Sequence, residues 1–294
     1  MKNPFVGAGV ALVTPFNADL SIDFVGLRNL VNYQIDNGID FLVVQGTTGE
    51  APTLSKDEKL KVLQVVQEEN RGRLKIIFGV GGNNTSEVGT LLQNLPTDGL
   101  DGILSVSPYY NKPTQQGIIA HYKHIASCTS LPIVLYNVHS RTGSNVLAST
   151  TLELSKIENI VAMKEASGDF GQIMEIIMHK GEDFGVLSGD DAITMPLMSI
   201  GVEGVISVVA NAFPKKFAQM IHYSMDMSVD AAKQIHYDLL PMIDMLFEEG
   251  NPGGVKVALE KQGIIQSHMR KPLYPVSGGL RSRIEAETLR ILTQ

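Results

Sequence analysis

The sequence has one cysteine, no tryptophan and no long apolar run, and only 19% of its residues are charged. Because Cys128 is the only cysteine, an intrachain disulfide is excluded, as is typical of proteins in a reducing compartment. No apolar stretch approaches the length of a membrane-spanning helix, and the N-terminus lacks the apolar core of a signal peptide. We therefore expect a soluble, cytoplasmic protein without a membrane partner.

Basic residues are also scarce. Lysine and arginine number 24 against 31 aspartate and glutamate residues, so the formal net charge is -7. No basic block is present, and this acidic balance argues against a nucleic-acid partner. What the chain has in quantity is apolar residues, 44% of 294, which are enough for a large buried core in a single unit.

Short apolar runs typical of strands alternate with longer runs that have helical spacing. Ser55 with Glu58, and Thr150 with Glu153, have the spacing of a capping box and predict helix starts, as does Asp169. The pattern predicts strands at residues 7–13, 39–44, 74–80, 99–106, 132–135, 160–163, 184–187 and 204–208, and helices at residues 23–37, 55–70, 84–95, 114–127 and 214–225, with further helices starting near 150 and 169.

Eight repeats of a strand followed by a helix predict an α/β fold, a (β/α)8 TIM barrel. Parallel strands need covering crossovers, and right-handed repetition of such units closes into a barrel. A doubly wound open sheet is the alternative. It normally has a glycine fingerprint after its first strand, and the Gly-Ala-Gly sequence at residues 7–9 lacks the third glycine.

The alternation ends near residue 226. Helical patterns follow at residues 231–248, 254–262 and 279–292, separated by proline and glycine. We therefore predict a catalytic barrel domain at residues 1–226 and a C-terminal helical domain at residues 227–294. The second domain carries no cluster of catalytic residue types, so we expect it to serve packing or subunit contacts.

Polar residues collect at the C-terminal ends of the predicted strands, where a barrel of this kind has its active site. Lys164 follows the apolar residues 160–163, where an ammonium group is poorly solvated. Poor solvation favours the neutral amine, a nucleophile that forms Schiff bases with carbonyl substrates. The alternative is a structural lysine paired with a neighbouring carboxylate. Lys75 starts its strand, at the opposite end of the barrel, and is interpreted as structural.

Three further features lie at the same end. Residues 46–50 form a glycine-bounded turn with two hydroxyls that suits a small carboxylate, although an ordinary turn has the same composition. Tyr136 ends its strand, and its phenol can carry protons during Schiff-base chemistry or simply be a hydrogen-bonded core tyrosine. Arg141 can hold a carboxylate through two hydrogen bonds, or it is an ordinary surface arginine.

Other candidate sites are less favoured. His121 and His124 share a helix face and could bind a metal, but no acidic residue stands at ligand spacing, so we interpret them as solvated. Asp190 and Asp191 could be paired carboxylates, but Asp190 more simply caps the next helix. The sequence has neither the serine motif of hydrolases nor a Walker loop.

Five motifs occur in order along the chain and together indicate a family. They are Gly-Thr-Thr-Gly-Glu at residues 46–50, Tyr-Tyr-Asn-Lys-Pro at 109–113, Tyr-Asn-Val-His-Ser-Arg-Thr-Gly at 136–143, Lys-Glu-Ala-Ser-Gly-Asp at 164–169 and Ser-Gly-Asp-Asp at 188–191. The chain resembles the dihydrodipicolinate synthase and N-acetylneuraminate lyase family over essentially its whole length. The resemblance implies a lyase of lysine and diaminopimelate biosynthesis, which condenses pyruvate with L-aspartate 4-semialdehyde to 4-hydroxy-tetrahydrodipicolinate through a Schiff base.

The resemblance also implies roles for single residues. Lys164 matches the lysine that forms an imine with pyruvate, and Tyr136 matches the tyrosine that donates and accepts protons over that imine. Thr47 matches a threonine that links two tyrosines in a proton relay. Tyr110 matches the second tyrosine, which reaches into the site of a neighbouring subunit. Because the protonated imine is the electron sink, no metal or organic cofactor is expected.

The implied binding residues follow the same motifs. The backbone N–H of Thr48 helps to hold the pyruvate carboxylate, and Arg141 receives the carboxylate of aspartate semialdehyde. Gly189 and Ile206 match backbone positions that line the pocket. The family further implies a homotetramer built as a dimer of dimers.

Two departures from the family pattern carry predictions. His139 replaces a usual proline, which predicts a less rigid segment around Arg141. The chain keeps three residues of the cleft in which many bacterial relatives bind lysine as an inhibitor, namely Asn83, Glu87 and Tyr109. It has Ala51, Pro52, Lys56 and Lys59 where lysine-sensitive relatives often carry Ser, Ala and two His. Because added cations should repel a lysine ligand, we predict weak or absent inhibition by lysine.

Two other functions stay open at this point. Another pyruvate-dependent aldolase, acting on N-acetylneuraminate or a 2-keto-3-deoxy sugar acid, would use Lys164 and Tyr136 in the same way. Arg141 favours the semialdehyde, because a sugar offers hydroxyls there instead of a carboxylate. The remaining alternative is a non-catalytic barrel that binds a keto acid as a sensor or scaffold.

Overall fold

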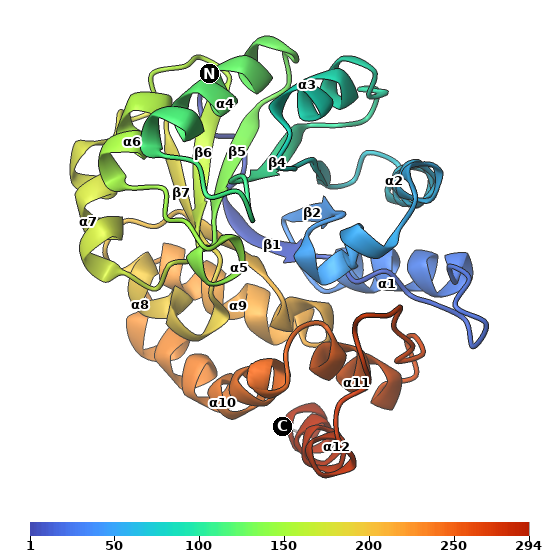
Figure 1. Cartoon of the computed structure of the whole chain (residues 1–294). Coiled ribbons are helices and arrows are strands. Elements are labelled where there is room, and N and C mark those ends of the chain that lie inside the picture. Colours follow the sequence, from blue (N-terminus) through green and yellow to red (C-terminus); the bar gives the residue numbers. More distant parts are fainter. Residues whose placement is uncertain (294) are drawn as a thin grey trace. The chain divides into compact units, whose positions relative to one another are not determined.

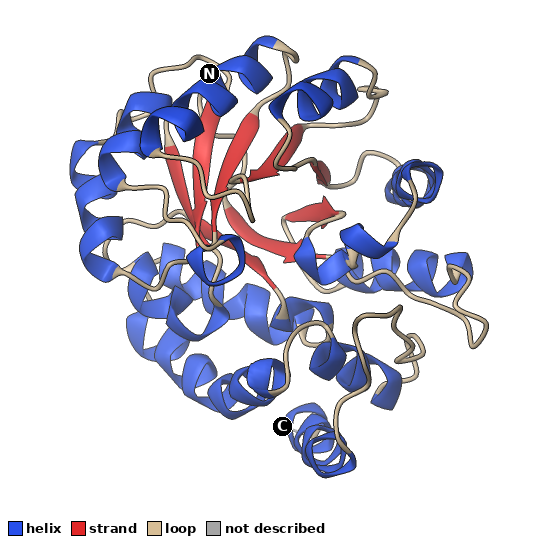
Figure 2. Ribbon diagram, viewed as in Figure 1, coloured by secondary structure: helices blue, strands red, loops and turns tan. Residues whose placement is uncertain are grey.

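The strands of this protein form one closed barrel. The computed structural model describes residues 1–293, in which eight strands pair in the order β1 to β8. Helices separate the strands along the chain, and only helices follow β8 in the described residues (Figure 2). The predicted α/β barrel with a helical C-terminal region is therefore confirmed.

The chain divides into two compact units. The first consists of Met1–Val6 and Lys75–Ile206 and contains Lys164, so we call it the lysine unit. The second consists of Gly7–Leu74 and Ser207–Gln294 and contains the threonine turn, so we call it the threonine unit. The predicted division into a barrel domain and a helical domain at residue 226 stays a prediction.

The lysine unit carries most of the barrel strands and the candidate nucleophile. In Figure 1, helices α4, α6 and α7 lie along the outer side of its strands. Its strands are β3 Lys75–Gly79, β4 Gly102–Val106, β5 Ile133–Asn137, β6 Ile160–Glu165, β7 Gly185–Ser188 and β8 Gly204–Ser207, and its helices are α3 Thr85–Gln93, α4 Gln115–Ser127, α5 His139–Thr142, α6 Ala148–Leu154, α7 Phe170–His179, the 3-10 helix η3 Asp191–Ile193 and α8 Thr194–Met198.

The threonine unit joins the first two strands to the C-terminal helices. Its elements are β1 Gly7–Ala11, α1 Phe24–Asp36, β2 Phe41–Val44, the 3-10 helices η1 Thr47–Gly49 and η2 Ala51–Thr53, α2 Lys56–Asn70, the 3-10 helix η4 Val209–Asn211, α9 Pro214–Met225, α10 Val229–Glu248, α11 Gly253–Lys261 and α12 Gly278–Leu292. Helix α12 packs against α10 and α11. Among residues 1–293, no helix combines the length and the apolarity needed to cross a lipid bilayer.

Two neighbouring barrel strands, β5 and β6, are buried along their whole length. Every residue of β5 and of β6 is buried, because parallel strands are covered on both faces. This explains why their sequences read as continuous apolar runs rather than alternating ones. It also means that a polar side chain at the end of such a strand loses most of its water.

Helix starts follow the predicted caps in all but one case. Ser55 and Glu58 form a capping box at α2, and the Asp169 side chain accepts a hydrogen bond from Gln172 N at the start of α7. The capping box predicted at Thr150 is wrong, since α6 begins at Ala148 and Thr150 lies inside it. The Thr150 hydroxyl instead donates to Gln115 Oε1 at 2.6 Å, a tertiary partner that its local sequence does not reveal.

Candidate active site

Lys164 and Tyr136 lie beside each other at the ends of β6 and β5. The two residues are register partners on adjacent strands, and Lys164 Nζ lies 4.2 Å from the centroid of the Tyr136 ring. Both side chains are buried, with exposed fractions of 6% and 7%. No carboxylate pairs with Lys164 in the part of the chain that the structure describes. The alternative of a structural lysine held by an acidic partner is therefore not supported.

Gly189 leaves the space that the Lys164 side chain occupies. A Cβ atom at this position would lie 2.9 Å from Lys164 Cε and 2.7 Å from the Ala166 Cβ, closer than such carbons approach each other. The Gly189 N–H donates to the Glu165 carbonyl at 2.8 Å, which fixes the backbone beside the lysine. Only glycine fits this position without displacing the candidate nucleophile.

A buried polar network lies behind the two residues. Successive side chains of a strand point to opposite faces, so Asn137 and Glu165 face away from Tyr136 and Lys164. The Glu165 carboxylate accepts hydrogen bonds from Asn137 Nδ2 at 3.0 and 3.1 Å. It also accepts from Ser167 N at 2.8 Å and from Gln172 Nε2 at 3.0 Å. Burial raises the pKa of the Glu165 carboxyl, while these hydrogen bonds act in the opposite direction.

The segment after β5 carries an exposed cation. Arg141 lies on the short helix α5, exposed to solvent, and forms no ion pair among residues 1–293. A guanidinium without a carboxylate partner remains able to bind an anionic ligand through two hydrogen bonds. Sequence-predicted Ile206, by contrast, is fully buried near the end of β8, so it can contribute to a pocket only through its backbone.

Tyr110 is held in an unusual conformation. Its φ is 73°, in the left-handed region that a bulky residue rarely adopts, and 87% of its surface is exposed. Neighbouring Tyr109 is also exposed, and its carbonyl accepts a hydrogen bond from Asn83 Nδ2 at 3.1 Å. Backbone strain of this kind persists where a functional position requires it.

The predicted regulatory residues Asn83 and Tyr109 lie together in the lysine unit, joined by this hydrogen bond. Glu87 lies in the first turn of α3.

The threonine turn is built in the other unit. Thr47 and Thr48 start η1, and Glu50, which follows η1, has a left-handed backbone with a φ of 56°. Thr48 is buried, and its hydroxyl accepts a hydrogen bond from Asn251 Nδ2 at 2.9 Å. Asn251 belongs to the helical C-terminal region, which the sequence assigned only to packing or subunit contacts. That region therefore also fixes a predicted substrate-binding residue.

A buried ion pair supports the same turn. Lys256 of α11 pairs with Glu50, and both side chains have an exposed fraction of 0%. Lys256 Nζ also donates to the His268 carbonyl at 2.8 Å, and Arg270 N donates to the second Glu50 oxygen at 3.1 Å. Burial lowers the pKa of Lys256 to about 8, against the effect of its glutamate partner. Sequence reasoning missed this lysine, although its apolar neighbours in α11 indicate burial.

The interpretation of His121 as a solvated residue is wrong. Only 3% of its surface is exposed, and its Nδ1 lies 2.9 Å from the Thr85 hydroxyl, which belongs to the neighbouring helix α3. Burial lowers the pKa of His121 to about 4. His124, on the same helix, is exposed as predicted. A neutral buried histidine bonded to a hydroxyl is a packing element rather than half of a metal site.

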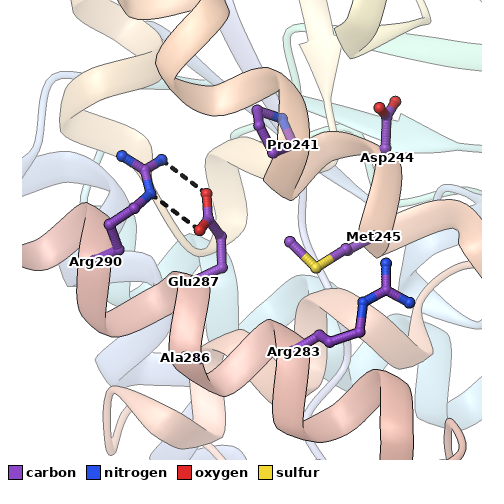
Figure 3. Close-up of a pocket in the computed structure, with 7 residues that line it drawn as sticks. All are labelled: Pro241, Asp244, Met245, Arg283, Ala286, Glu287 and Arg290. Atoms are coloured by element: carbon purple, nitrogen blue, oxygen red, sulfur yellow. Dashed lines mark hydrogen bonds and ion pairs between the residues drawn. The ribbon is translucent and has the colours of Figure 1, made fainter.

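An open hollow lies between α10 and α12 in the threonine unit. Its volume is about 620 Å³, and Figure 3 shows it lined by Arg283, Glu287 and Arg290 among others. Its arginines are already paired, Arg290 with Glu287 at 2.7 Å and Arg283 with Glu248 at 2.8 Å. None of the lining residues belongs to the predicted site. We therefore assign this hollow no ligand.

Comparisons with known proteins agree with this geometry. The model of the dihydrodipicolinate synthetase family matches residues 4–290. A curated 4-hydroxy-tetrahydrodipicolinate synthase of Flavobacterium psychrophilum is 46% identical over 98% of each chain. The crystal structure of dihydrodipicolinate synthase from Aquifex aeolicus has a TM-score of 0.94 and 40% identity, covering 98% of each chain.

A further solved structure carries a ligand. It is the chloride-inhibited dihydrodipicolinate synthase from Acinetobacter baumannii complexed with pyruvate, with a TM-score of 0.93 and 38% identity over 96% of this chain and 97% of that one. The predicted family resemblance is thus confirmed over nearly the whole length. With its closed barrel and a buried lysine beside a tyrosine, this chain belongs to the dihydrodipicolinate synthetase family.

Proposed function

We propose that this chain condenses pyruvate with L-aspartate 4-semialdehyde to give 4-hydroxy-tetrahydrodipicolinate, a lyase reaction of lysine and diaminopimelate biosynthesis. One observation carries the proposal: a buried Lys164 without a carboxylate partner, whose Nζ lies 4.2 Å from the Tyr136 ring. A buried lysine amine without a carboxylate partner is placed to attack a carbonyl carbon and form a Schiff base. The names of its relatives and the pyruvate complex of one of them support the choice of substrates.

The proposed reaction begins with attack of Lys164 Nζ on C2 of pyruvate. The carbinolamine loses water to give a protonated imine, and loss of a C3 proton gives an enamine. The enamine C3 attacks the aldehyde carbon of the semialdehyde, whose amine then attacks C2 and expels the lysine. These steps move protons to or from the substrate oxygen, C3 and the lysine nitrogen. The Tyr136 phenol is the group we assign to these transfers, because its ring adjoins Nζ.

The remaining roles rest on the family motifs and the local geometry of each residue. We assign the relay of protons to Thr47 and Tyr110, and the carboxylate of pyruvate to the backbone N–H of Thr48. The exposed, unpaired guanidinium of Arg141 suits the carboxylate of the semialdehyde. Gly189 leaves room beside the lysine, which suits its assigned role in the pocket wall. We assign the backbone of Ile206 to the same wall on the family motif alone.

Tyr110 also bears on the assembly and location that we propose. A tyrosine that is 87% exposed and held in a strained backbone suits insertion into a neighbouring subunit. We propose a homotetramer, built as a dimer of dimers, in which Tyr110 completes the partner's site. The single cysteine fits action in the reducing cytoplasm.

Trapping with borohydride tests the proposed chemistry. Reduction in the presence of pyruvate should add the mass of one reduced pyruvate to the wild-type protein, at Lys164. Lys164→Ala should abolish the adduct, whereas Lys75→Ala, which removes an exposed lysine at the start of β3, should leave it unchanged. Absence of an adduct on the wild type would reject the Schiff base and leave only a keto-acid-binding barrel.

Steady-state assays separate the possible second substrates. Aspartate semialdehyde should support turnover, and N-acetylneuraminate should not. Tyr136→Phe should slow turnover about 10²-fold or more, the usual value of a general acid–base group, while the fold is kept. Turnover of the sugar acid at a comparable rate would reassign the protein to the aldolases that act on sugar acids.

We further propose that lysine inhibits this enzyme weakly or not at all. The chain keeps Asn83, Glu87 and Tyr109 but carries Lys56 and Lys59, whose cations should repel a lysine ligand. Substituting both lysines by histidine should increase sensitivity in a steady-state assay. Strong inhibition of the wild type by millimolar lysine would contradict the proposal.

A further inference from the structure

The Glu165 network links both catalytic strand ends to the helices around them. Asn137 and Glu165 directly follow Tyr136 and Lys164 and are register partners of each other. Asn137 Nδ2 donates to both Glu165 oxygens, and Asn137 Oδ1 accepts from Val146 N at 3.0 Å. This pair bridges the two strands one residue beyond the reactive side chains. Any change in its geometry moves the backbone that carries them.

Two further amides extend the network to α7 and to the segment that follows Arg141. Gln172 Nε2 donates to Glu165 Oε2 at 3.0 Å, and Asn145 Nδ2 donates to Gln172 Oε1 at 2.8 Å. Asn137 Nδ2 donates to Asn145 Oδ1 at 2.7 Å, which closes the ring of four side chains. Each amide is oriented by its neighbours, so the donors around Glu165 are fixed in direction.

The centre of this ring is an acceptor without a hydrogen of its own. An ionised carboxylate has only acceptor oxygens, and those of Glu165 receive the Asn137 amide, the Ser167 N–H and the Gln172 amide. A glutamine at this position keeps the volume but points an NH2 group at one of these donors. Buried donors that face each other lose their hydrogen bonds, and the geometry then relaxes.

We propose that Glu165 is a positioning residue, whose ionised side chain locks the ends of β5 and β6 in register and thereby holds Lys164 Nζ against the Tyr136 phenol. The inference rests on the proposed Schiff-base function, since the distance it protects is the one that the chemistry uses. A displacement of about 1 Å between reacting groups can cost about 10²-fold in rate. In this scheme, Glu165 contacts neither the amine of Lys164 nor the hydroxyl of Tyr136. It acts on both through the backbone.

Rates of adduct formation test the proposal. The pyruvate adduct is trapped with borohydride at saturating pyruvate, so that the maximal rate and the pyruvate dependence are measured separately. Glu165→Gln should lower the maximal rate about tenfold or more, with a smaller change in the pyruvate concentration for half-maximal rate. The control is Glu203→Gln, which removes a carboxylate bonded to Asn3 and Lys180 just before β8, and which should keep the wild-type rate.

A swap of the carboxylate and the amide distinguishes positioning from loss of folding. In Glu165→Gln with Gln172→Glu, the carboxylate at 172 accepts from the amide at 165 and keeps the Asn145 donor, and the oxygen at 165 still accepts from Asn137 and Ser167. Two contacts are lost: Asn137 Nδ2 no longer donates to the second oxygen at 165, a contact of 3.1 Å, and Gln172 Nε2 no longer donates to Asn145 Oδ1, a contact of 3.3 Å. The double variant should recover most of the rate that Glu165→Gln loses.

The outcomes separate the two claims. A wild type without an adduct rejects the proposed function itself. A wild type that forms the adduct, with Glu165→Gln at the same maximal rate, rejects the positioning role. A Glu165→Gln protein that forms the adduct slowly, with no recovery in the swap, also rejects it, because the fixed direction of the donors would then not be the cause.

Discussion

Two of the predicted catalytic motifs contain a buried glutamate, Glu50 and Glu165. Each glutamate supports its motif by a different kind of interaction. Glu165 directly follows Lys164 and is held by amide and backbone N–H donors without a cation. Glu50 ends the threonine turn and is held by the buried cation Lys256 and by Arg270 N. A network of hydrogen bonds without a cation fixes direction through many weak bonds, whereas an ion pair concentrates its energy in one contact.

The difference also lies in sequence distance. The partners of Glu165 are at positions 137, 167 and 172, all near the same two strand ends. The partner of Glu50 is 206 positions away, in the C-terminal helices. The lysine side of the chemistry is therefore supported locally, and the threonine turn is supported by the end of the chain.

Loss of the cation should have the largest effect. Lys256→Met leaves Glu50 as an uncompensated buried charge, and breaking a buried pair in this way typically costs about 3–5 kcal/mol of stability. The free energy of unfolding, from urea titration, measures it. Lys261→Met is the matched control, because Lys261 ends the same helix but is exposed, and it should change stability by less than about 0.5 kcal/mol. Equal effects of both variants would show that the ion pair is not what supports the turn.

Neutralising the other glutamate should cost less. Glu165→Gln leaves no unpaired charge, only misdirected donors, so we expect a loss of about 1–3 kcal/mol in the same titration. The variant should nevertheless stay folded and lower the maximal rate of adduct formation about tenfold or more. If Glu165→Gln destabilised the protein more than Lys256→Met, the contrast between a directional network and a concentrated ion pair would be wrong.

Sequence reasoning captured what local pattern determines. Apolar runs that end in Lys164 and Tyr136 predicted two strand ends with neighbouring side chains. In the structure, Lys164 Nζ lies 4.2 Å from the centroid of the Tyr136 ring. The pairing of Lys256 with Glu50 was missed because the residues around each of them in the sequence give no indication of such a distant partner. His121 was wrongly interpreted as solvated for the same reason, since its hydrogen-bond partner, the hydroxyl of Thr85, lies on another helix.

Two carboxyl groups beside these supports, Glu58 and Glu165, should respond to acid with opposite signs. Hydrogen bonds from Arg270, whose backbone also holds Glu50, lower the pKa of Glu58 to about 2, below the usual value of about 4.3. That contribution is present above about pH 4.3 and is lost as the pH falls through about 2. Burial raises the pKa of Glu165, so its contribution is present below the unfolded pKa and is lost as the pH rises through the folded one.

Urea titrations between pH 7 and pH 3 check these signs. Glu58→Gln should flatten the decline of stability at low pH by about 1 kcal/mol, since its partly exposed carboxylate is screened by solvent. Glu165→Gln should remove an opposite trend, in which acidification adds stability. Identical pH profiles for the wild type and both variants would contradict the comparison.

The smallest expected effect concerns the segment between Tyr136 and Arg141. His139 is the first residue of α5, and Pro is favoured at the first position of a helix, where the N–H has no helical partner. His139→Pro should therefore stabilise the protein by about 0.4–1 kcal/mol, chiefly by restricting the unfolded chain. Differential scanning calorimetry measures the shift in Tm. Because the Glu165 network ends at Val146, beyond this helix, the maximal rate of adduct formation should stay unchanged. A changed rate would mean that the α5 segment, and not the network alone, sets the geometry at Lys164.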